Sequence, residues 1–375
     1  MSTLPATSIE QTLARAQRGD EGAFQQIVEA YRGELHAHCY RMLGSVHDAD
    51  DALQDAMLRA WKSLGKFKGN SSLRSWLYKI ATNTCLDLIN KRPKRQLPLD
   101  VASDADPFDG PGQPLIESVW VEPYPDEQLG LADGLAAPEA NYEMRESVEL
   151  AFIAALQHLP ANQRAVLIMR EVLGFSAQEA ADLLETSTAS VNSALQRARA
   201  SVDEKLPDQS QQATLRALGD DELQKLVENY MDAIQNGDVN RVVSMLAEDA
   251  AWSMPPLATW YRGERIPDFL SVGPLSGDWR WKHVPTHANG QLAVGCYTWD
   301  DDEQAYLPFC VDVLTLEGDK IKEVTAFIVK ELKGDAEQGP EDDREYYKRF
   351  PDQAINPAAK NVVFDRFGLP DRISE

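Results

Sequence analysis

The stretch Asp48-Ala-Asp-Asp-Ala-Leu-Gln-Asp-Ala-Met-Leu-Arg-Ala-Trp-Lys62 is followed, after a short loop, by Ser75-Trp-Leu-Tyr-Lys-Ile-Ala-Thr-Asn-Thr-Cys-Leu-Asp-Leu-Ile-Asn-Lys-Arg92. In both segments the apolar residues recur every three or four positions, which is the spacing of one face of an α-helix. Ser71 or Ser72 stands where the N-cap of the second helix is expected. The sequence therefore predicts an all-α domain over residues 1–95.

The first of these helices carries polar and apolar side chains on the face opposite its apolar stripe, namely Asp51, Asp55 and Leu58. Two like charges four residues apart destabilise an isolated helix by about 0.3 kcal/mol, so local helix stability does not explain them. Two interpretations stay open: the face binds a partner, or it is a solvated acidic surface.

Charge is distributed unevenly along the chain. The net charge is -23, yet Arg59 to Arg95 holds 10 basic residues and a single acidic one, Asp87. A basic block inside an acidic chain is typical of a module that contacts phosphates. An aromatic ring beside lysines can also stack an unpaired base. The candidate nucleic-acid contacts in this block are Phe67, Lys68, Asn70, Ser71, Lys79, Asn83, Asp87, Lys91 and Arg92.

A second helical domain is predicted over residues 141–206, after a linker over residues 96–140 that is rich in Pro, Gly and Asp. Ser176-Ala-Gln-Glu179 matches a capping box, and Thr188 to Val202 forms the last helix of a helix-turn-helix. The outer side of that helix carries side chains that can bind bases or phosphates: Asn192, Ser193, Gln196, Arg197 and Arg199.

Residues 207–375 change to an α+β pattern, with helices over 220–236 and 239–246 followed by strands over 250–254, 279–286, 291–299, 306–317 and 320–329. We expect a curved antiparallel sheet packed on helices, with Gly318-Asp319 as a hairpin turn. Several aromatic residues could line a ligand pocket or form the core: Trp252, Trp260, Tyr261, Trp281 and Tyr297.

The first domain resembles region 2 of the sigma-70 superfamily. The string Leu159-Pro-Ala-Asn-Gln-Arg164, together with the helix-turn-helix, resembles sigma region 4. Regions 2 and 4 without a region 3 are the arrangement of the extracytoplasmic-function group. The resemblance implies that Asp51, Asp55 and Leu58 bind core RNA polymerase, that the Phe67 loop and the basic face read the minus ten element, and that the last helix reads the minus thirty-five element. Glu185 departs from the pattern, because a turn glycine is common there.

The C-terminal domain resembles the SnoaL and NTF2-like cone, on strings such as Trp260-Tyr-Arg-Gly263 and Asn289-Gly290. The linker motif Trp120-Val-Glu-Pro-Tyr-Pro-Asp126 resembles a signature of sigma factors fused to this domain type. We hypothesise that the linker docks on the C-terminal domain through Trp120, Pro123, Tyr124 and Pro125. The alternative is a spacer stiffened by proline. Residues 333–360 look like an acidic insertion without an assignable role.

The expected function is therefore that of an alternative sigma factor regulated in cis by its C-terminal domain. Because some members of the SnoaL fold are enzymes, Asp249, His283, His287 and Asp312 are candidate acid-base residues, although none sits in a motif that specifies chemistry. The alternatives are an enzyme whose N-terminal domains only bring it to DNA, and a helix-turn-helix repressor whose C-terminal domain senses a small ligand. A sigma factor needs no catalytic residue of its own.

Four cysteines, Cys39, Cys85, Cys296 and Cys310, lie far apart and form no C-x-x-C pair, so the sequence predicts reduced, mostly buried thiols and neither metal nor cofactor. No apolar run approaches the roughly 18 residues that span a bilayer. With no secretory leader pattern, the sequence predicts a cytoplasmic protein.

Overall fold

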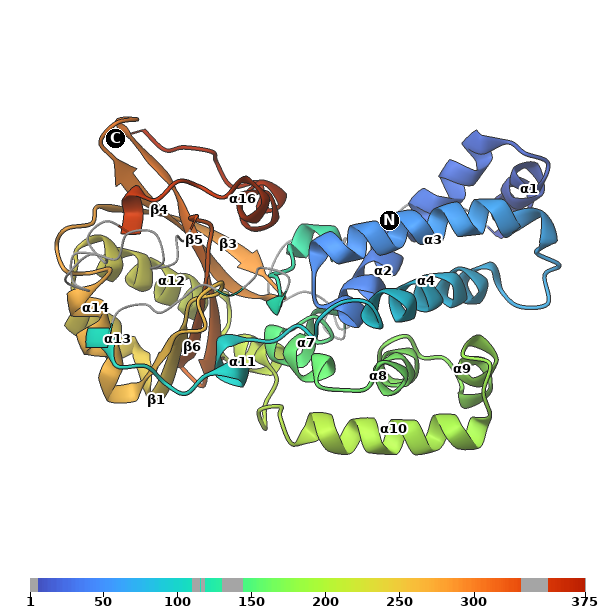
Figure 1. The fold of residues 1–375 in the computed structure, drawn as a ribbon, viewed down its shortest axis with the longest axis horizontal. Helices are drawn as coiled ribbons and strands as arrows, with labels where there is room; N and C mark the ends of the chain where they lie inside the picture. The colour runs from blue at the N-terminus through green and yellow to red at the C-terminus, as the bar shows by residue number, and fades with distance from the viewer. Residues whose placement is uncertain (1–5, 110–114, 116–118, 130–143, 332–349, 375) are drawn as a thin grey trace. The chain divides into compact units, whose positions relative to one another are not determined.

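The computed structural model describes residues 6–109, 115, 119–129, 144–331 and 350–374. The chain divides into two compact units (Figure 1). The first comprises the described residues within 1–95, 127–131 and 150–206, and the second those within 96–126, 132–149 and 207–375. No described helix is long and apolar enough to cross a membrane.

The first unit is helical, as the sequence predicts. Its N-terminal part consists of α1 (Ala6–Gln17), α2 (Glu21–Leu43), α3 (Val46–Ser63) and α4 (Leu73–Ile89). Ser72 is confirmed as the N-cap of α4, since its side chain accepts a hydrogen bond from the Ser75 amide. Gly44 ends α2 with a φ of 69°, a conformation that glycine adopts without steric penalty.

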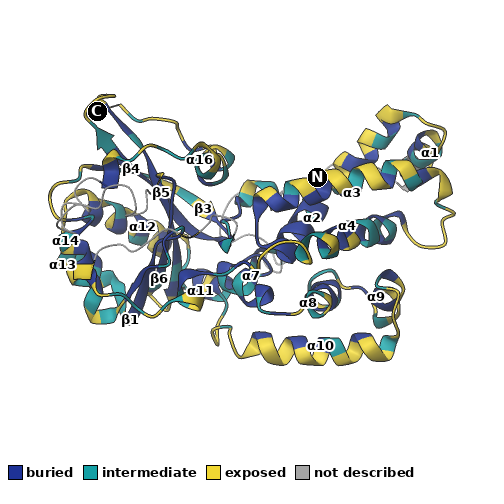
Figure 2. Ribbon diagram, viewed as in Figure 1, coloured by how far each residue is buried: buried dark blue, intermediate teal, exposed yellow. Residues whose placement is uncertain are grey.

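The second part of this unit contains α7 (Leu150–Gln157), α8 (Ala161–Leu167), α9 (Ala177–Leu183) and α10 (Thr188–Asp203). A π-helical turn over Ile168–Val172 follows α8. In α10 the buried positions recur at helical spacing, and the rest of the helix is mostly exposed (Figure 2). Helix α10 therefore turns one long polar face to solvent.

The second unit is built on a six-stranded sheet in the order β2-β1-β6-β5-β4-β3. Its strands are β1 (Leu246–Ser253), β2 (Trp260–Arg262), β3 (Trp281–Ala288), β4 (Gln291–Asp300), β5 (Ala305–Glu317) and β6 (Lys320–Ile328). The expectation of an antiparallel sheet is wrong at one place, because β1 runs parallel to β6. No hairpin joins these two strands, so no turn fixes their relative direction.

Helices cover one face of this sheet and complete its core. They are α11 (Gln211–Leu218), α12 (Asp220–Gln235), α13 (Val239–Met245) and α14 (Ile266–Val272). Buried residues of all four helices join one hydrophobic cluster with the strands. The predicted linker contributes α5 (Pro98–Val101) to this unit, and α16 (Pro357–Val363) lies near the C-terminal end. Most of the predicted acidic insertion, residues 332–349, lies outside the described residues.

Candidate functional site

One face of α3 presents an apolar side chain to solvent beside two carboxylates. Leu58 is 52% exposed, and both Asp51 and Asp55 are exposed at helical spacing from it. Leu58 also lines a groove formed by α2 and α3, to which Phe24 and Trp61 contribute aromatic rings. This face therefore offers a partner both apolar contact and negative charge.

The loop before α4 holds its aromatic residue against the helix and its polar residues outward. The rings of Phe67 and Trp76 lie 5.1 Å apart between centroids, and Phe67 is half-buried. Lys68, Asn70 and Ser71 are exposed. For Phe67 to stack an unpaired base, its ring would have to leave Trp76 or accept the base on its free face.

Part of the basic face of α4 is engaged by ion pairs within the same unit. Arg59 Nη1 lies 2.9 Å from Asp87 Oδ2, and Arg92 pairs with Asp48 at the start of α3. Lys79 Nζ lies 3.0 Å from Glu185 Oε1, in the turn between α9 and α10. The other two predicted residues of this face are exposed: Asn83 and Lys91.

The helix-turn-helix has the predicted capping box. Ser176 Oγ accepts from the Glu179 amide at 3.1 Å, and Glu179 Oε2 accepts from the Ser176 amide at 2.8 Å. The candidate base- and phosphate-binding side chains of α10 are all exposed: Asn192, Ser193, Gln196, Arg197 and Arg199. Arg199 also pairs with Glu171 at 2.7 Å.

Glu185 adopts a φ of 53°, which is unusual for a residue with a side chain. We expect Glu185→Gly to leave the stability of the turn nearly unchanged, because relief of about 1 kcal/mol of backbone strain is offset by the entropy of glycine. Losing the exposed pair with Lys79, worth up to about 1 kcal/mol, should raise apparent DNA affinity about threefold. Fluorescence anisotropy with labelled DNA measures this affinity. Glu185→Gln should give the same gain, and an unchanged affinity in both variants would contradict the expectation.

The two parts of the first unit are joined by a buried arginine. Arg164 of α8 is 4% exposed, and its guanidinium donates to the carbonyl oxygens of Met42, Gln157 and Leu159. Gln157 Nε2 donates to the carbonyl of Arg41. The carbonyls of Arg41 and Met42 lie in the last turn of α2, where helix carbonyls have no partner within the helix. Residues of α7 and α8 thus cap the C-terminal end of α2.

In the second unit, the described residues of the predicted linker lie against the sheet and its loops. Trp260 Nε1 donates to the Ala102 carbonyl at 2.9 Å, and the Ala105 amide donates to the Trp260 carbonyl at 2.9 Å. Trp120 forms a parallel bridge with Gln96. The four candidate docking residues are buried in this unit: Trp120, Pro123, Tyr124 and Pro125.

The turn between β3 and β4 binds two separate segments of the chain. Asn289, between β3 and β4, has a φ of 57° and no exposed surface. Its Oδ1 accepts from the Tyr124 amide at 2.8 Å, and its own amide donates to the Tyr124 carbonyl at 2.8 Å. Its Nδ2 donates to the Val148 carbonyl at 2.7 Å. Asn289 therefore binds the chain between the two helical parts at two places, near its middle at Tyr124 and near its end at Val148.

Two carboxylates reinforce these attachments. Asp126 Oδ1 accepts from the Gly290 amide at 2.7 Å, and burial raises the pKa of Asp126 to about 6. Glu149 accepts from the amides of Gln211 and Gln212 at 3.1 and 2.8 Å, and burial raises its pKa to about 7. These amides belong to the first two residues of α11, so the second attachment is a helix N-terminus bound to an acidic side chain.

The sheet and the helices enclose a small cavity, and only part of the predicted pocket lines it. Trp252 and Trp281 lie in its wall, together with the candidate acid-base residues His283 and Asp312. The other three aromatics pack elsewhere in the unit. Trp260 binds the linker, Tyr261 stacks on Phe269, and Tyr297 donates to the carbonyl of Pro370 near the C-terminal end.

The remaining acid-base candidates do not reach the cavity wall. Asp249 is exposed and pairs with Lys322, which holds the pKa of that carboxyl below its usual range. His287 lies one residue before Ala288 at the end of β3.

The sequence analysis missed two residues with large roles, Arg164 and Asn289. Only Asn289 had a signal, because Asn-Gly between two strands is a strong hairpin pattern.

Three family models match the chain. Residues 27–95 match sigma-70 region 2, residues 149–202 match sigma-70 region 4, and residues 227–324 match a SnoaL-like domain. The chain is 41% identical over 320 residues to the ECF RNA polymerase sigma factor SigG of Mycobacterium tuberculosis, which covers 84% of this chain and 83% of SigG. It is 27% identical over 202 residues to the ECF RNA polymerase sigma factor SigW of Bacillus subtilis, covering 53% of this chain and 97% of SigW.

Among solved structures, the crystal structure of the Mycobacterium tuberculosis extracytoplasmic-function sigma factor SigJ is similar with a TM-score of 0.52 and 22% identity. The match covers 81% of this chain and 95% of that one. At this identity the likeness shows a shared fold: helical domains followed by a cone with a mixed sheet and helices.

Proposed function

Because the chain belongs to the extracytoplasmic-function RNA polymerase sigma factors, whose sigma-70 regions 2 and 4 serve promoter recognition and transcription initiation, we propose that its SnoaL-like unit regulates initiation in cis by holding the linker between these regions. Sigma factors bind core RNA polymerase and promoter DNA. The observation that carries the proposal is that Asn289 binds both Tyr124, near the middle of the segment between these regions, and Val148, at the end of that segment.

Regions 2 and 4 are in contact in the first unit, and this contact is incompatible with reading two separated elements. The minus ten and minus thirty-five elements are about 25 base pairs apart, which is about 85 Å along B-DNA. Lys79 of region 2 lies only 3.0 Å from Glu185 of region 4. The two regions must therefore separate before both elements are bound, and the linker must follow.

Release of the linker would supply the reach that this separation needs. A freely extended segment of about 50 residues spans up to about 170 Å, twice the distance between the elements. Each hydrogen bond that holds the linker on the SnoaL-like unit therefore opposes opening. In this proposal the unit restrains the sigma factor, and any change that weakens docking raises initiation.

We also propose how the two regions bind their partners. The exposed face of α3 around Leu58 contacts core polymerase, with Asp51 and Asp55 supplying charge complementarity. The Phe67 loop and the polar face of α4 bind the minus ten element, and the outer face of α10 binds the minus thirty-five element. The chain would act in the cytoplasm, where polymerase and promoter DNA are found.

The polymerase face is tested by charge reversal. We expect Asp51→Lys combined with Asp55→Lys to lower run-off transcription with core polymerase at least tenfold. The two lysines would face positive charge on the polymerase, and such like-charge contacts oppose association by about 2 kcal/mol. Both side chains are exposed, so the fold should be retained. Glu204→Lys, at the exposed end of α10, is the matched control and should initiate like the wild type.

Transcription by the double variant at the wild-type level would exclude this face. The same assay separates the alternatives, since a repressor would bind its operator tightly without polymerase and would not support initiation. Turnover of a small substrate without any effect on initiation would instead favour an enzyme.

A further inference from the structure

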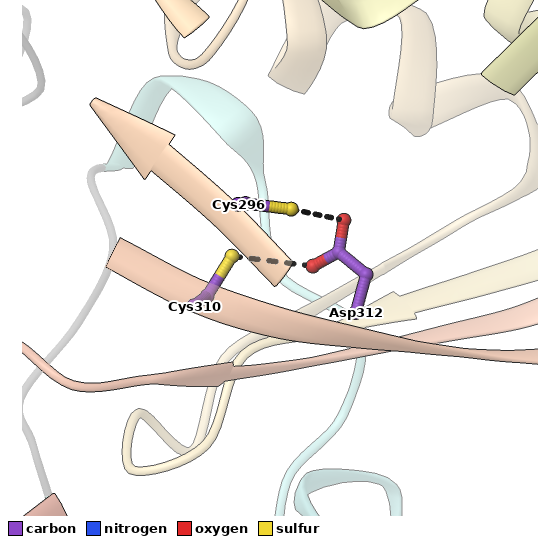
Figure 3. Close-up of side chains that lie close together, drawn as sticks. All are labelled: Cys296, Cys310 and Asp312. Atoms are coloured by element: carbon purple, nitrogen blue, oxygen red, sulfur yellow. Dashed lines mark hydrogen bonds between the residues drawn. The ribbon is translucent and has the colours of Figure 1, made fainter. Parts of the chain in front are cut away.

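Two cysteines and an aspartate meet inside the SnoaL-like unit. Cys296 of β4 lies directly opposite Cys310 of β5 in the ladder, and Asp312 lies two residues beyond Cys310 on the same face. The two sulfur atoms and a carboxylate oxygen all lie within 4.8 Å of one another. Figure 3 shows both thiols directed at the carboxylate, with Cys296 Sγ 3.4 Å from Oδ2 and Cys310 Sγ 3.2 Å from Oδ1.

A histidine extends this group across the sheet. His283 of β3 lies directly opposite Cys296, so His283, Cys296 and Cys310 form one row over three adjacent strands. Directly opposite side chains in antiparallel strands are about 5 Å apart at Cβ. Both ring nitrogens of His283 are buried, and neither has a hydrogen-bond partner among the residues that the structure describes. A buried polar atom without a partner is unusual and calls for one.

The cavity beside these four residues is too small for an organic ligand of ordinary size. About 40 Å³ of it is open to a water-sized molecule. Ligand pockets for drug-sized molecules measure roughly 300 Å³ or more, whereas a single water needs roughly 10–15 Å³. The rest of the wall is mainly aromatic and aliphatic, with Phe269 and Phe309 among its rings. An ion with one or two waters fits this space, and it would lie at the polar end of the cavity.

The kinds of ligand atom at this site indicate which metal ion it can bind. Thiolates together with an imidazole and a carboxylate suit Zn²⁺, which takes four such ligands in a tetrahedron, whereas Mg²⁺ and Ca²⁺ prefer oxygen ligands alone. Usual Zn–S and Zn–O lengths in a tetrahedron place sulfur and oxygen about 3.5 Å apart. Each sulfur meets a different oxygen of Asp312, at 3.4 and 3.2 Å, and one carboxylate oxygen lies within 4.8 Å of both sulfurs, so a small shift of the side chains brings these three ligand atoms to zinc distances.

We propose that Cys296, Cys310 and Asp312 bind a Zn²⁺ ion in the SnoaL-like unit and that His283, which lies outside their 4.8 Å cluster, supplies the fourth ligand by turning its ring toward the ion. Binding replaces the two thiol protons, which are released to solvent, and no electron is transferred. Two thiolates, one carboxylate and the divalent ion leave a single net negative charge. Tyr230, whose hydroxyl donates to Asp312 Oδ2 at 2.8 Å, orients the carboxylate as an outer partner. The four cysteines look unrelated in sequence, and the strand pairing brings two of them together.

Metal titration of the full-length, reduced and chelator-treated protein tests this site. We expect one equivalent of Zn²⁺ per chain to be retained after desalting. Co²⁺ in place of Zn²⁺ should give near-ultraviolet thiolate-to-metal charge-transfer bands and the visible bands of tetrahedral cobalt. The cobalt spectrum reports thiolate ligation without any substitution, so it does not depend on a variant that folds.

Substitution then assigns the ligands. Cys296→Ser and Cys310→Ser should each remove the charge-transfer intensity of one thiolate and weaken binding at least 100-fold, and His283→Gln should weaken it at least tenfold. Cys39→Ser, a buried thiol of region 2, should bind like the wild type. Failure to retain stoichiometric Zn²⁺, a cobalt spectrum without charge-transfer bands, or undiminished binding in both Cys296→Ser and Cys310→Ser would overturn the proposal.

Discussion

Asn289→Ala should lower the free energy of linker docking by about 4 kcal/mol and raise transcription initiation at limiting polymerase at least tenfold. The substitution leaves the Tyr124 amide and the Val148 carbonyl buried without their side-chain partner, which costs about 1.5 kcal/mol for each group. Alanine at a positive φ adds about 1 kcal/mol. A change of this size shifts a docking equilibrium about 1000-fold.

Limited proteolysis and run-off transcription measure the two parts of this expectation. Chymotrypsin should cut after Trp120 much faster in Asn289→Ala, because Trp120 is only 4% exposed when the linker is docked. Asn289→Gly keeps the turn conformation and removes only the side chain, so it should retain most of the effect. Asn240→Ala, an exposed asparagine of α13, is the matched control. Faster cleavage with unchanged initiation would mean that docking does not restrain the sigma factor.

Arg164→Met should weaken the contact between regions 2 and 4 by about 3 kcal/mol. The guanidinium is buried among neutral oxygens, and burial lowers the pKa of Arg164 to about 10. Methionine fills similar space but leaves the carbonyl of Met42, in region 2, without this donor, and a hydrogen bond from a charged donor contributes about 1.5–3 kcal/mol. The bonds to Gln157 and Leu159 within region 4 are lost as well, and they hold the cap on α2 in place, so we expect the upper end of this range.

Hydrogen exchange of the full-length protein measures this loss. Amides of α9 and of the following turn should exchange about 100-fold faster in Arg164→Met, because region 4 leaves region 2 more often. Arg32→Met removes an exposed arginine of α2 and should leave exchange unchanged. Equal protection of α9 in Arg164→Met and wild type would show that the caps on α2 do not hold the regions together.

The helical half of the molecule could be predicted from sequence because its signals are local. The apolar spacing of α3 and α4, the N-cap Ser72 and the capping box of Ser176 and Glu179 each act within a few residues. The Gly318-Asp319 turn is local in the same way, and it joins β5 to β6 as expected.

The contacts on which the proposed regulation depends are long-range and have no sequence pattern. Arg164 binds backbone carbonyls of α2, and any residue there offers the same oxygen atom. The parallel pairing of β1 with β6 and the pairing of Cys296 with Cys310 depend on strand order, which local spacing does not encode. Trp260 and Tyr297 look like pocket residues by type, yet their polar groups bind Ala102 and Pro370.

The distance between regions 2 and 4 in solution tests the central claim most directly. Because all four native cysteines are buried, dyes can be attached selectively at Lys62→Cys in α3 and Ala200→Cys in α10, both exposed. Single-molecule energy transfer should then show a short-distance population for the free protein. A long-distance population should grow on adding core polymerase and promoter DNA, and also in Asn289→Ala without them. Identical distance distributions for Asn289→Ala and wild type, both free and with polymerase, would contradict control of the sigma regions by the docked linker.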